Sequence, residues 1–163
     1  MCARRADRSA VSKTWGRGLL ISLLLGSNQA LAYCWDEVAR RYDLEPELLQ
    51  AIAAVESGYR AQAINSANAN GTHDIGLMQI NSSQLPRLLK LGITEERLLN
   101  DPCLSVEVGA SILAEFVQRF GYNWTAVGSY NVGPGAGAER DALRLRYAEK
   151  VWARYEALMA HRN

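Results

Sequence analysis

Apolar positions recur along most of the chain with the 3.6-residue period of amphipathic helices. Pro46 suits a first helical position, and the helix that it opens stops at Gly58. Gly92 and Gly121 end two further helices in the same way. Besides the helix that begins at Pro46, the pattern predicts helices over residues 36–42, 84–91, 95–99, 102–120, 124–129 and 141–159.

A turn-rich stretch between residues 59 and 75 interrupts these helices. It is rich in asparagine and contains Asn70-Gly71, a hairpin-turn signal. Its flanks alternate too weakly for more than two or three short strands. Since no repeats or low-complexity linkers appear, we expect one domain over residues 33–163. The predicted fold class is mainly α, with a small β-hairpin excursion after the second helix.

The first 32 residues have the order of a secretory signal peptide. A basic segment precedes an apolar run over residues 19–25, and Ala30-Leu31-Ala32 forms an A-x-A cleavage site. The run is shorter than the roughly 20 residues of a membrane span. We therefore expect cleavage after Ala32 and a periplasmic protein, with an uncleaved anchor as the alternative. Lipid attachment at Cys34 is rejected because Tyr33 is too large for the position before it.

The expected export determines which cysteines remain in the mature chain and whether they can form a disulfide. Cys2 leaves with the signal peptide, so the mature chain keeps Cys34 and Cys103. We expect these two to pair in an oxidising compartment, with two free buried thiols as the alternative. The lack of a Cys-x-x-Cys pair, with His73 and His161 as the only histidines, predicts no metal site.

Composition and charge exclude several classes of protein. With 48% hydrophobic residues among 163, the chain is too apolar for disorder, and it has no sustained heptad for a coiled coil. Its net charge is +1, but residues 33–163 alone hold 13 basic and 16 acidic side chains, a net charge of −3. A nucleic-acid binder would carry a basic stripe, so we expect no nucleic-acid partner.

Glu56 is the unusual residue of the second predicted helix. It lies one turn after Ile52 on the apolar side, near the C-terminal end. The negative end of the helix dipole and burial against apolar side chains would both raise the pKa of this carboxyl. A carboxyl that is protonated near neutral pH can act as a general acid. The alternative is that Glu56 simply turns outward to solvent at a helix end.

Two polar elements follow in the chain. In Gly76-Leu77-Met78-Gln79-Ile80-Asn81, the glycine permits close approach of a ligand, and Gln79 and Asn81 offer the donors and acceptors that bind amides and sugar hydroxyls. Tyr130 and Asn131 precede a Gly-rich turn that lacks the strand and the lysine of a phosphate-binding loop. Taken singly, each element is explained equally well by core residues or a helix end.

Together, three short motifs resemble the signature motifs of the soluble lytic transglycosylase (family 1) catalytic domain: Glu56-Ser57, Gly76-Leu77-Met78-Gln79 and Tyr130-Asn131-Val132-Gly133. The resemblance runs from Trp35 to about Tyr155. The small size, Asp101-Pro102-Cys103 and the early cysteine resemble the specialised enzymes of secretion, conjugation and type IV pilus systems. Ser129 stands where the third motif usually begins with alanine, which is a small change.

The resemblance implies a lysozyme-like fold and one catalytic acid/base, Glu56. This carboxyl would protonate the oxygen that links N-acetylmuramic acid (MurNAc) to N-acetylglucosamine (GlcNAc), and then accept the proton of the MurNAc C6 hydroxyl as that oxygen attacks C1. The product is a 1,6-anhydroMurNAc end. Ser57 would orient Glu56 or contact a substrate amide, and Met78 and Gln79 would line the cleft. Tyr130 would hydrogen-bond near Glu56, and Asn131 would hold substrate or the Tyr130 turn.

The partners implied are peptidoglycan glycan strands and an envelope-spanning machine, for which the enzyme would open the cell wall locally. We expect a monomer that needs neither metal nor cofactor. Asp74, which lies 18 positions after Glu56, provides the rival mechanism. A lysozyme-type hydrolase would use Glu56 as acid and Asp74 as nucleophile or stabiliser. A noncatalytic peptidoglycan-binding assembly factor is the third hypothesis.

Two further sets of residues are expected to be structural. Aromatic residues at helical spacing should lie in the core: Trp35, Trp124, Trp152 and Tyr155. Three arginines should form a solvated face, with acidic peptidoglycan stems or a partner as alternative contacts: Arg140, Arg144 and Arg146.

Overall fold

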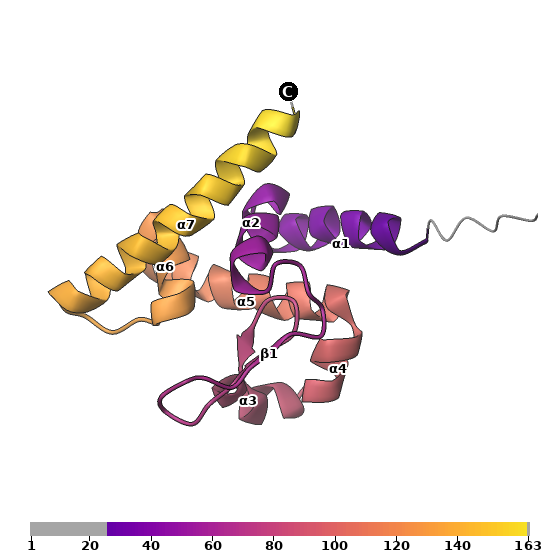
Figure 1. The fold of residues 1–163 in the computed structure, drawn as a ribbon, viewed down its shortest axis with the longest axis horizontal. Helices are drawn as coiled ribbons and strands as arrows, with labels where there is room; N and C mark the ends of the chain where they lie inside the picture. The colour runs from indigo at the N-terminus through magenta and orange to yellow at the C-terminus, as the bar shows by residue number, and fades with distance from the viewer. Residues whose placement is uncertain (1–25, 163) are drawn as a thin grey trace, which may run out of the picture.

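The computed structural model describes residues 26–162, with side chains from Cys34 onward. Within this range the chain is mainly helical, as predicted, with a small antiparallel sheet (Figure 1). The helices are α1 (Gly26–Tyr42), α2 (Pro46–Glu56), the 3-10 helix η1 (Ser82–Gln84), α3 (Leu85–Leu89), α4 (Glu95–Asn100), α5 (Pro102–Phe120), α6 (Trp124–Val132) and α7 (Ala138–Arg162). The strands are β1 (Ile64–Asn65), β2 (Asp74–Ile75) and β3 (Ile80–Asn81).

Helices α2 and α5 begin at the predicted prolines, Pro46 and Pro102. The carboxylate of Asp101 caps α5 by accepting a hydrogen bond from the backbone N–H of Leu104. Other boundaries differ from the prediction. Helix α1 begins ten residues earlier than expected, because residues 29–32 are good helix formers. The helix expected over residues 84–91 is divided into η1 and α3, and the side chain of Asn81 caps η1.

The predicted signal peptide lies outside the described residues up to Leu25, and α1 runs across its expected end at Ala32. Cleavage and export therefore stay predictions. None of the helices described between residues 26 and 162 is long and apolar enough to cross a membrane.

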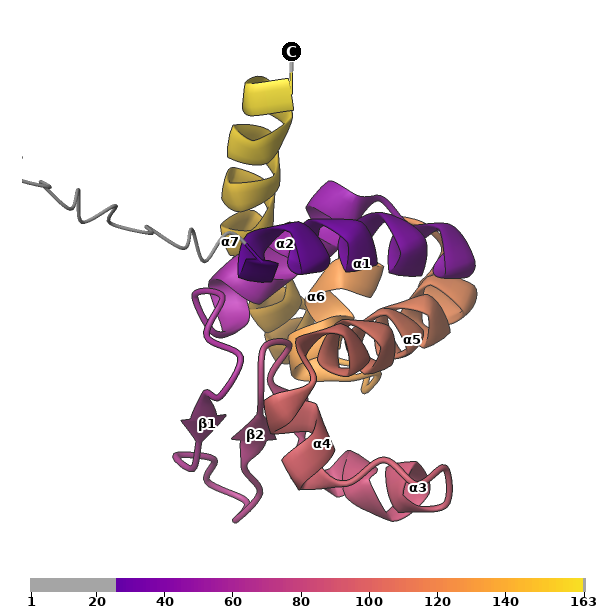
Figure 2. The ribbon, with the colours of Figure 1, turned by 90° about the vertical axis from the view of Figure 1, so that its right-hand side faces the viewer.

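Helix α5 lies between two groups of elements (Figures 1 and 2). On one side are α1, α2 and α7, and on the other are the strands with α3 and α4. Helices α1 and α6 pack against α5, and α2 packs against α7. Leu49, Ile52, Val106 and Leu113 are fully buried where these helices meet. This apolar core holds the C-terminal end of α2 next to the sheet.

The sheet has the order β1-β2-β3 and is antiparallel throughout. Its register places Asp74 opposite Asn65 on one side and Asn81 on the other. The connection between β1 and β2 spans residues 66–73, so Asn70-Gly71 lies within a wide loop instead of forming a tight two-residue hairpin. The predicted β-hairpin excursion after the second helix is confirmed, with strands of two residues each.

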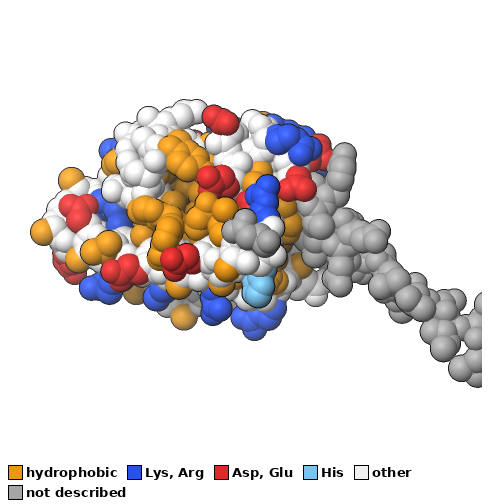
Figure 3. Space-filling model, turned by 90° about the horizontal axis from the view of Figure 1, so that it is seen from above, with side chains coloured by type: hydrophobic (Ala, Val, Ile, Leu, Met, Phe, Trp, Pro, Cys, Tyr) orange, Lys and Arg blue, Asp and Glu red, His pale blue; other side chains and the backbone are white. Residues whose placement is uncertain are grey.

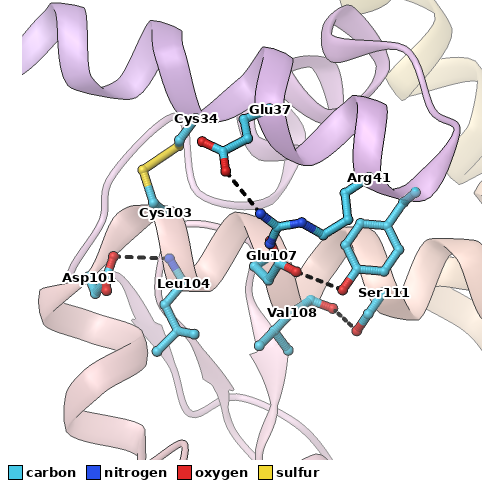
Figure 4. Close-up of polar contacts among 10 residues, drawn as sticks. Cys34, Glu37, Arg41, Asp101, Cys103, Leu104, Glu107, Val108 and Ser111 are labelled. Atoms are coloured by element: carbon cyan, nitrogen blue, oxygen red, sulfur yellow. Dashed lines mark hydrogen bonds and ion pairs between the residues drawn. A yellow bond between two sulfur atoms is a disulfide. The ribbon is translucent and has the colours of Figure 1, made fainter.

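A disulfide joins Cys34 in α1 to Cys103 in the first turn of α5 (Figure 4). The predicted pairing is thereby confirmed, with a Cα–Cα distance of 5.8 Å. One turn further along α5, Glu107 accepts hydrogen bonds from Arg41 and from the hydroxyl of Tyr42. The disulfide and these polar contacts fix the angle between α1 and α5.

The aromatic residues expected in the core divide into two groups. Trp35 is buried, as predicted, but Trp124 and Trp152 are 37% and 43% exposed. Their rings meet edge to face at 5.1 Å, and both contact the ring of Tyr155. The prediction was wrong for these two tryptophans because helical spacing places residues on one face without showing whether another element covers it. Hydrophobic side chains also gather in a band on the face shown in Figure 3.

The three arginines expected on a solvated face also differ from one another. Arg144 is only 4% exposed and donates hydrogen bonds to the carbonyls of Gly133 and Gly135. The prediction was therefore wrong for Arg144, which holds the turn between α6 and α7 from inside. Arg140 is exposed and donates to the carbonyl of Val132, at the start of the same turn.

Candidate active site

Glu56 is the last residue of α2, and it is half-buried. The residues before it on the same helix pack into the core, including Leu49, Ile52 and Ala53. Because the helix ends at Glu56, its carboxyl lies where the core meets the sheet and the C-terminal helix α7. The structure thus places the carboxyl in a partly apolar setting, as the sequence pattern indicated, and does not turn it outward.

Burial raises the pKa of Glu56 from its ordinary value of 4.5 to about 7. The hydrogen bond from Tyr147 opposes this rise, the negative charge of Asp74 adds to it, and the positive charge of Lys150 opposes it. Near neutral pH the carboxyl is therefore divided between its protonated and ionised forms. Such a group can donate a proton in one step and accept one in the next.

Two tyrosines surround this carboxyl. The hydroxyl of Tyr147, in α7, donates a hydrogen bond of 2.6 Å to Oε1 of Glu56. The hydroxyl of Tyr130, in α6, donates instead to the backbone carbonyl of Met78 at 2.9 Å. Burial and the negative charge of Glu56 raise the pKa of both phenols well above the usual value. Both therefore remain protonated donors throughout the physiological pH range.

The turn at residues 76–79 links α2, the sheet and α5. Ser57 is buried, and its hydroxyl donates to the carbonyl of Leu77 at 2.7 Å, so it positions the backbone of this turn instead of facing the cleft. Gly76 has φ +75°, and a Cβ there would lie 2.8 Å from the carbonyl oxygen of Leu98. A glycine is required at this point because both the backbone conformation and the space exclude a side chain.

Met78 lies differently from its expected position on the cleft wall. Its side chain is fully buried against Gly109 of α5, where an added Cβ would meet it at 2.9 Å. Its backbone N–H donates to the hydroxyl of Ser105, and its carbonyl accepts from Tyr130. The side chain of Met78 therefore packs in the core, and its backbone connects the turn to Ser105 and Tyr130.

Gln79 and Asn131 lie at the cleft itself. Gln79 has φ +48°, an unusual conformation for a residue with a side chain, and its amide donates to the carbonyls of Ala63 and Gly76. These bonds hold the turn closed. Asn131 is exposed on the opposite side, at the end of α6.

The main cleft has a volume of about 710 Å³, which falls within the usual range for ligand pockets. Polar and apolar groups contribute about equally to its lining, which comes from the end of α2, the sheet with its loops and η1, and helices α5, α6 and α7: Glu56, Asn68, Ala69, Asn70, Thr72, Asp74, Gln79, Ile80, Asn81, Gln84, Ile112, Tyr130, Asn131, Val132, Arg140 and Leu143. A smaller side hollow of about 280 Å³ shares Glu56, Asn131 and Leu143 with the cleft. The amide and hydroxyl groups that line the cleft near Glu56 suit a neutral, hydroxyl-rich ligand.

Asp74 lines the same cleft as Glu56, but three amides hold it. Its Oδ2 accepts from the side chains of Asn65 and Asn68, at 3.2 and 3.0 Å, and its Oδ1 accepts from Asn81 at 2.7 Å. Asn65 and Asn81 are its partners across the sheet. The carboxylate therefore ties the three strands and the loop together.

Tyr147 is the main site residue that sequence reasoning did not identify. The helical period places it on the apolar side of the last predicted helix and indicates no further role. A phenol that faces inward requires a buried hydrogen-bond partner, and this requirement was the available signal. Which residue would be that partner depends on how α7 packs on α2, and helical spacing does not contain that information.

Comparison with known proteins agrees with this geometry. Residues 33–153 match the family described as the transglycosylase SLT domain. The chain belongs to this family. Membership implies a lytic transglycosylase that acts on peptidoglycan, and the mainly helical fold with a small sheet is consistent with it.

The chain is 46% identical over 140 residues to the invasion protein IagB of Salmonella typhimurium, which covers 86% of each chain. It is 43% identical over 129 residues to protein IpgF of Shigella flexneri, covering 79% of this chain and 83% of the relative. It is 36% identical over 143 residues to an X polypeptide of Escherichia coli, covering 88% and 83%.

Among solved structures, an inactive mutant of the lytic transglycosylase Slt from Pseudomonas aeruginosa matches with a TM-score of 0.60 at 19% identity. The match covers 78% of this chain and 24% of that one, so this chain spans about a quarter of the larger protein. At this identity the likeness shows a shared fold.

Proposed function

We propose that the protein cleaves the β-1,4 bond between MurNAc and GlcNAc in peptidoglycan strands and closes the MurNAc unit into a 1,6-anhydro ring. Glu56 is the observation that carries this proposal. Its half-buried carboxyl has a pKa of about 7, receives a phenol hydrogen bond, and lies in a cleft that amides and hydroxyls line in part.

In the first step the protonated Glu56 donates its proton to the oxygen that links the two sugars. The C1–O bond of MurNAc breaks, the GlcNAc unit leaves with a hydroxyl, and positive charge develops at C1 and the ring oxygen. The ionised carboxylate that results lies next to this positive charge. The hydrogen bond from Tyr147 stabilises the carboxylate as it forms.

In the second step the C6 hydroxyl oxygen of the same MurNAc unit bonds to C1. Its proton passes to Glu56, which returns to the protonated form that began the cycle. No water is consumed, and one carboxyl suffices for both proton transfers. The attacking hydroxyl belongs to the substrate, so this step is intramolecular and carries little entropic cost.

The cleft residues have supporting roles in this proposal. Asn131 offers an amide group for the N-acetyl and hydroxyl groups of the sugars, and Gln79 offers its amide oxygen, since its amide nitrogen already donates to Ala63 and Gly76. Tyr130 and Ser57 hold the backbone of the turn at Leu77 and Met78, which keeps Gln79 in position. Neither of them needs to touch the reacting atoms.

A lysozyme-type hydrolase using Asp74 is the second candidate, because Asp74 lines the same cleft. As nucleophile or stabiliser, the Asp74 carboxylate would have to turn toward the sugar. Its two oxygens already accept three amide hydrogen bonds, which must break for that movement. This cost favours the mechanism with a single carboxyl.

We also propose that the enzyme acts in the periplasm as a monomer and opens the wall locally for an envelope-spanning secretion, conjugation or pilus machine. The similarity to a protein named for invasion supports this role. The net charge of −3 over residues 33–163 suits an enzyme that a partner recruits, because it gives no attraction to an anionic wall.

Mass spectrometry of the products decides between the reactions. The purified protein and its Glu56→Gln variant are incubated with peptidoglycan sacculi. Muropeptides that end in 1,6-anhydroMurNAc, lighter by one water than reducing ends and absent with the variant, are the expected result. Reducing ends would favour the hydrolase with Asp74. No product from either protein would contradict the enzymatic proposal and favour the noncatalytic assembly factor.

A further inference from the structure

The side hollow next to Glu56 has an unusual charge distribution. Arg146 and Lys150 lie one turn apart on α7 and both line this hollow, which Glu56 shares with the main cleft. Both side chains are exposed, and neither forms an ion pair or a hydrogen bond with the residues that the structure describes. On the same helix, Arg144 and Arg162 each have a carboxylate partner.

These cations do not help the proton-donating step. The positive charge of Lys150 lowers the pKa of Glu56 and therefore works against the protonated form that this step requires. A second cation in the same hollow adds positive charge where no described anion other than Glu56 lies. Their position is better explained by an anion that enters with the substrate.

The chemistry of peptidoglycan provides such an anion. Its sugar rings are neutral, and the negative groups of a strand are carried by MurNAc through the lactyl ether at C3. These groups are the carboxylates of the attached peptide or, where the peptide has been removed, the lactyl carboxylate itself. They belong to the same sugar unit whose C1–O bond Glu56 would protonate, so they enter the site beside that carboxyl.

We propose that Arg146 and Lys150 bind the carboxylate carried by the C3 substituent of MurNAc and so select the unit that is cleaved. This inference rests on the proposed function. It makes α7 the wall that recognises the muramic side of the bond, while the sheet and its loops contact the neutral parts of the strand. Arg146 can hold a carboxylate through two parallel N–H donors, and Lys150 adds a point charge.

Binding measured without turnover tests the proposal independently of the reaction. The probe is a soluble glycan fragment with intact stem peptides, titrated by calorimetry into the Glu56→Gln protein. Adding Arg146→Gln and Lys150→Gln should weaken binding about 10-fold, as expected for the loss of charge-assisted contacts. The same fragment with its carboxylates converted to amides should bind both proteins equally. Equal binding of the unmodified fragment, or an equal loss for the amidated one, would overturn the proposal.

A fragment stripped of its peptides by an amidase identifies which carboxylate is bound. If the two substitutions still weaken binding of this fragment, the site also accepts the lactyl carboxylate, which the amidase frees from its amide bond to the peptide. If their effect disappears, the contact is to the stem peptide. Either result supports a carboxylate on the C3 substituent.

The matched control is Arg40→Gln with Lys90→Gln, which changes the charge equally at exposed residues that line neither hollow. It should leave binding unchanged. Arg146→Lys keeps the charge and should restore most of the affinity, which separates recognition from a folding defect. In the enzyme with Glu56 intact, kcat/KM on native strands should fall with the binding. Absence of anhydro products from that enzyme would refute the proposed reaction, whereas the titrations would still decide the role of the two cations.

Discussion

Two tyrosine-to-glutamate hydrogen bonds of the same length join α7 to the two ends of α2. At one end Tyr147 donates to Glu56, and at the other Tyr155 donates to Glu45, each at 2.6 Å. Glu56 is half-buried between two hollows of mixed polar and apolar lining, whereas Glu45 is exposed beside an aromatic hollow of about 190 Å³. Trp124, Trp152 and Tyr155 line the aromatic hollow, and its surface is mostly apolar.

The same residue pair lies in different surroundings at the two ends, and the proposed catalytic role of Glu56 depends on those surroundings. Burial raises the pKa of Glu56 to about 7, and the pKa of Tyr147 rises mainly through burial as well. At the other end the pKa of Tyr155 rises to about 12, mainly because its hydroxyl is bonded to the Glu45 carboxylate. The same hydrogen bond therefore holds the two helices together at both ends, and at the Glu56 end burial outweighs its lowering effect on the pKa of the carboxyl.

Replacing the two glutamates should give the largest contrast. Glu56→Gln keeps the shape and the contact with Tyr147 but cannot transfer a proton, so kcat/KM on sacculi should fall about 10³-fold. Glu45→Gln, at the exposed end, should leave kcat/KM within a factor of about two. Release of anhydromuropeptides measures both. Comparable losses in the two variants would refute the distinction.

The same pair should differ in how stability depends on pH. Because the pKa of Glu56 is about 7 in the folded protein and about 4.5 in the unfolded chain, the folded state binds a proton that the unfolded state releases between these values. Stability is therefore lost as the pH rises from about 4.5 to about 7. The loss is at most about 3 kcal/mol, and partial exposure of the side chain reduces it.

Glutamine cannot ionise, so Glu56→Gln should be more stable than the parent protein at about pH 8 and not at about pH 4. Urea unfolding at both pH values measures the free energy of unfolding. Glu45→Gln is the control and should change it by less than about 0.5 kcal/mol at either pH. A Glu56→Gln variant that gained no stability at the higher pH would show that burial of this carboxyl carries no cost.

Removing the phenol hydroxyls should have a smaller effect. The Tyr147 bond lowers the pKa of Glu56, so Tyr147→Phe should raise that pKa further above 7. The first step needs the protonated carboxyl, and the alkaline limb of the pH–rate profile should therefore move to higher pH. The rate at the optimum should fall about 10-fold, because the forming carboxylate loses an oriented donor. Tyr155→Phe should change neither, and an identical shift in both variants would count against a special role for Tyr147.

The smallest effect is expected at the aromatic hollow. Trp152→Ala removes the edge-to-face contact with Trp124 and should lower the free energy of unfolding by about 1 kcal/mol. The variant should keep its kcat/KM within a factor of about two, because Trp152 lines neither the main cleft nor the side hollow. A 10-fold loss of activity would mean that the two ends of the α2–α7 pair are coupled.

Much of the fold could be predicted from local signals. Pro46 and Pro102 mark helix starts, and the 3.6-residue period gives the inward side of α2 and α5. The solvent exposure of Trp152 could not be predicted in this way. Its spacing on α7 shows which face it occupies, but its exposure depends on which elements reach that face after folding.

The candidate site shows the same division. Glu56 could be recognised as a candidate from the sequence, because a carboxyl on the apolar side of a helix is rare and its burial costs free energy. The role of Met78 was less accessible, since its side chain enters the core while its carbonyl accepts from Tyr130. Every residue type has a backbone carbonyl that can accept a hydrogen bond, so the sequence does not reveal contacts of this kind. The same holds for the contact of Tyr147 with Glu56, which joins residues 91 positions apart.

The disulfide between Cys34 and Cys103 gives the folded chain the topology of a ring with a tail. The ring contains Glu56 and the turn at Gly76, and the tail contains Tyr130, Asn131 and Tyr147. The ring can close before the tail has folded, and at that stage the acid exists without its phenol donor or the second wall of its cleft. The cleft beside Glu56 is therefore complete only when the tail packs against the ring, so a chain whose C-terminal part has not yet folded lacks the arrangement on which the proposed reaction depends.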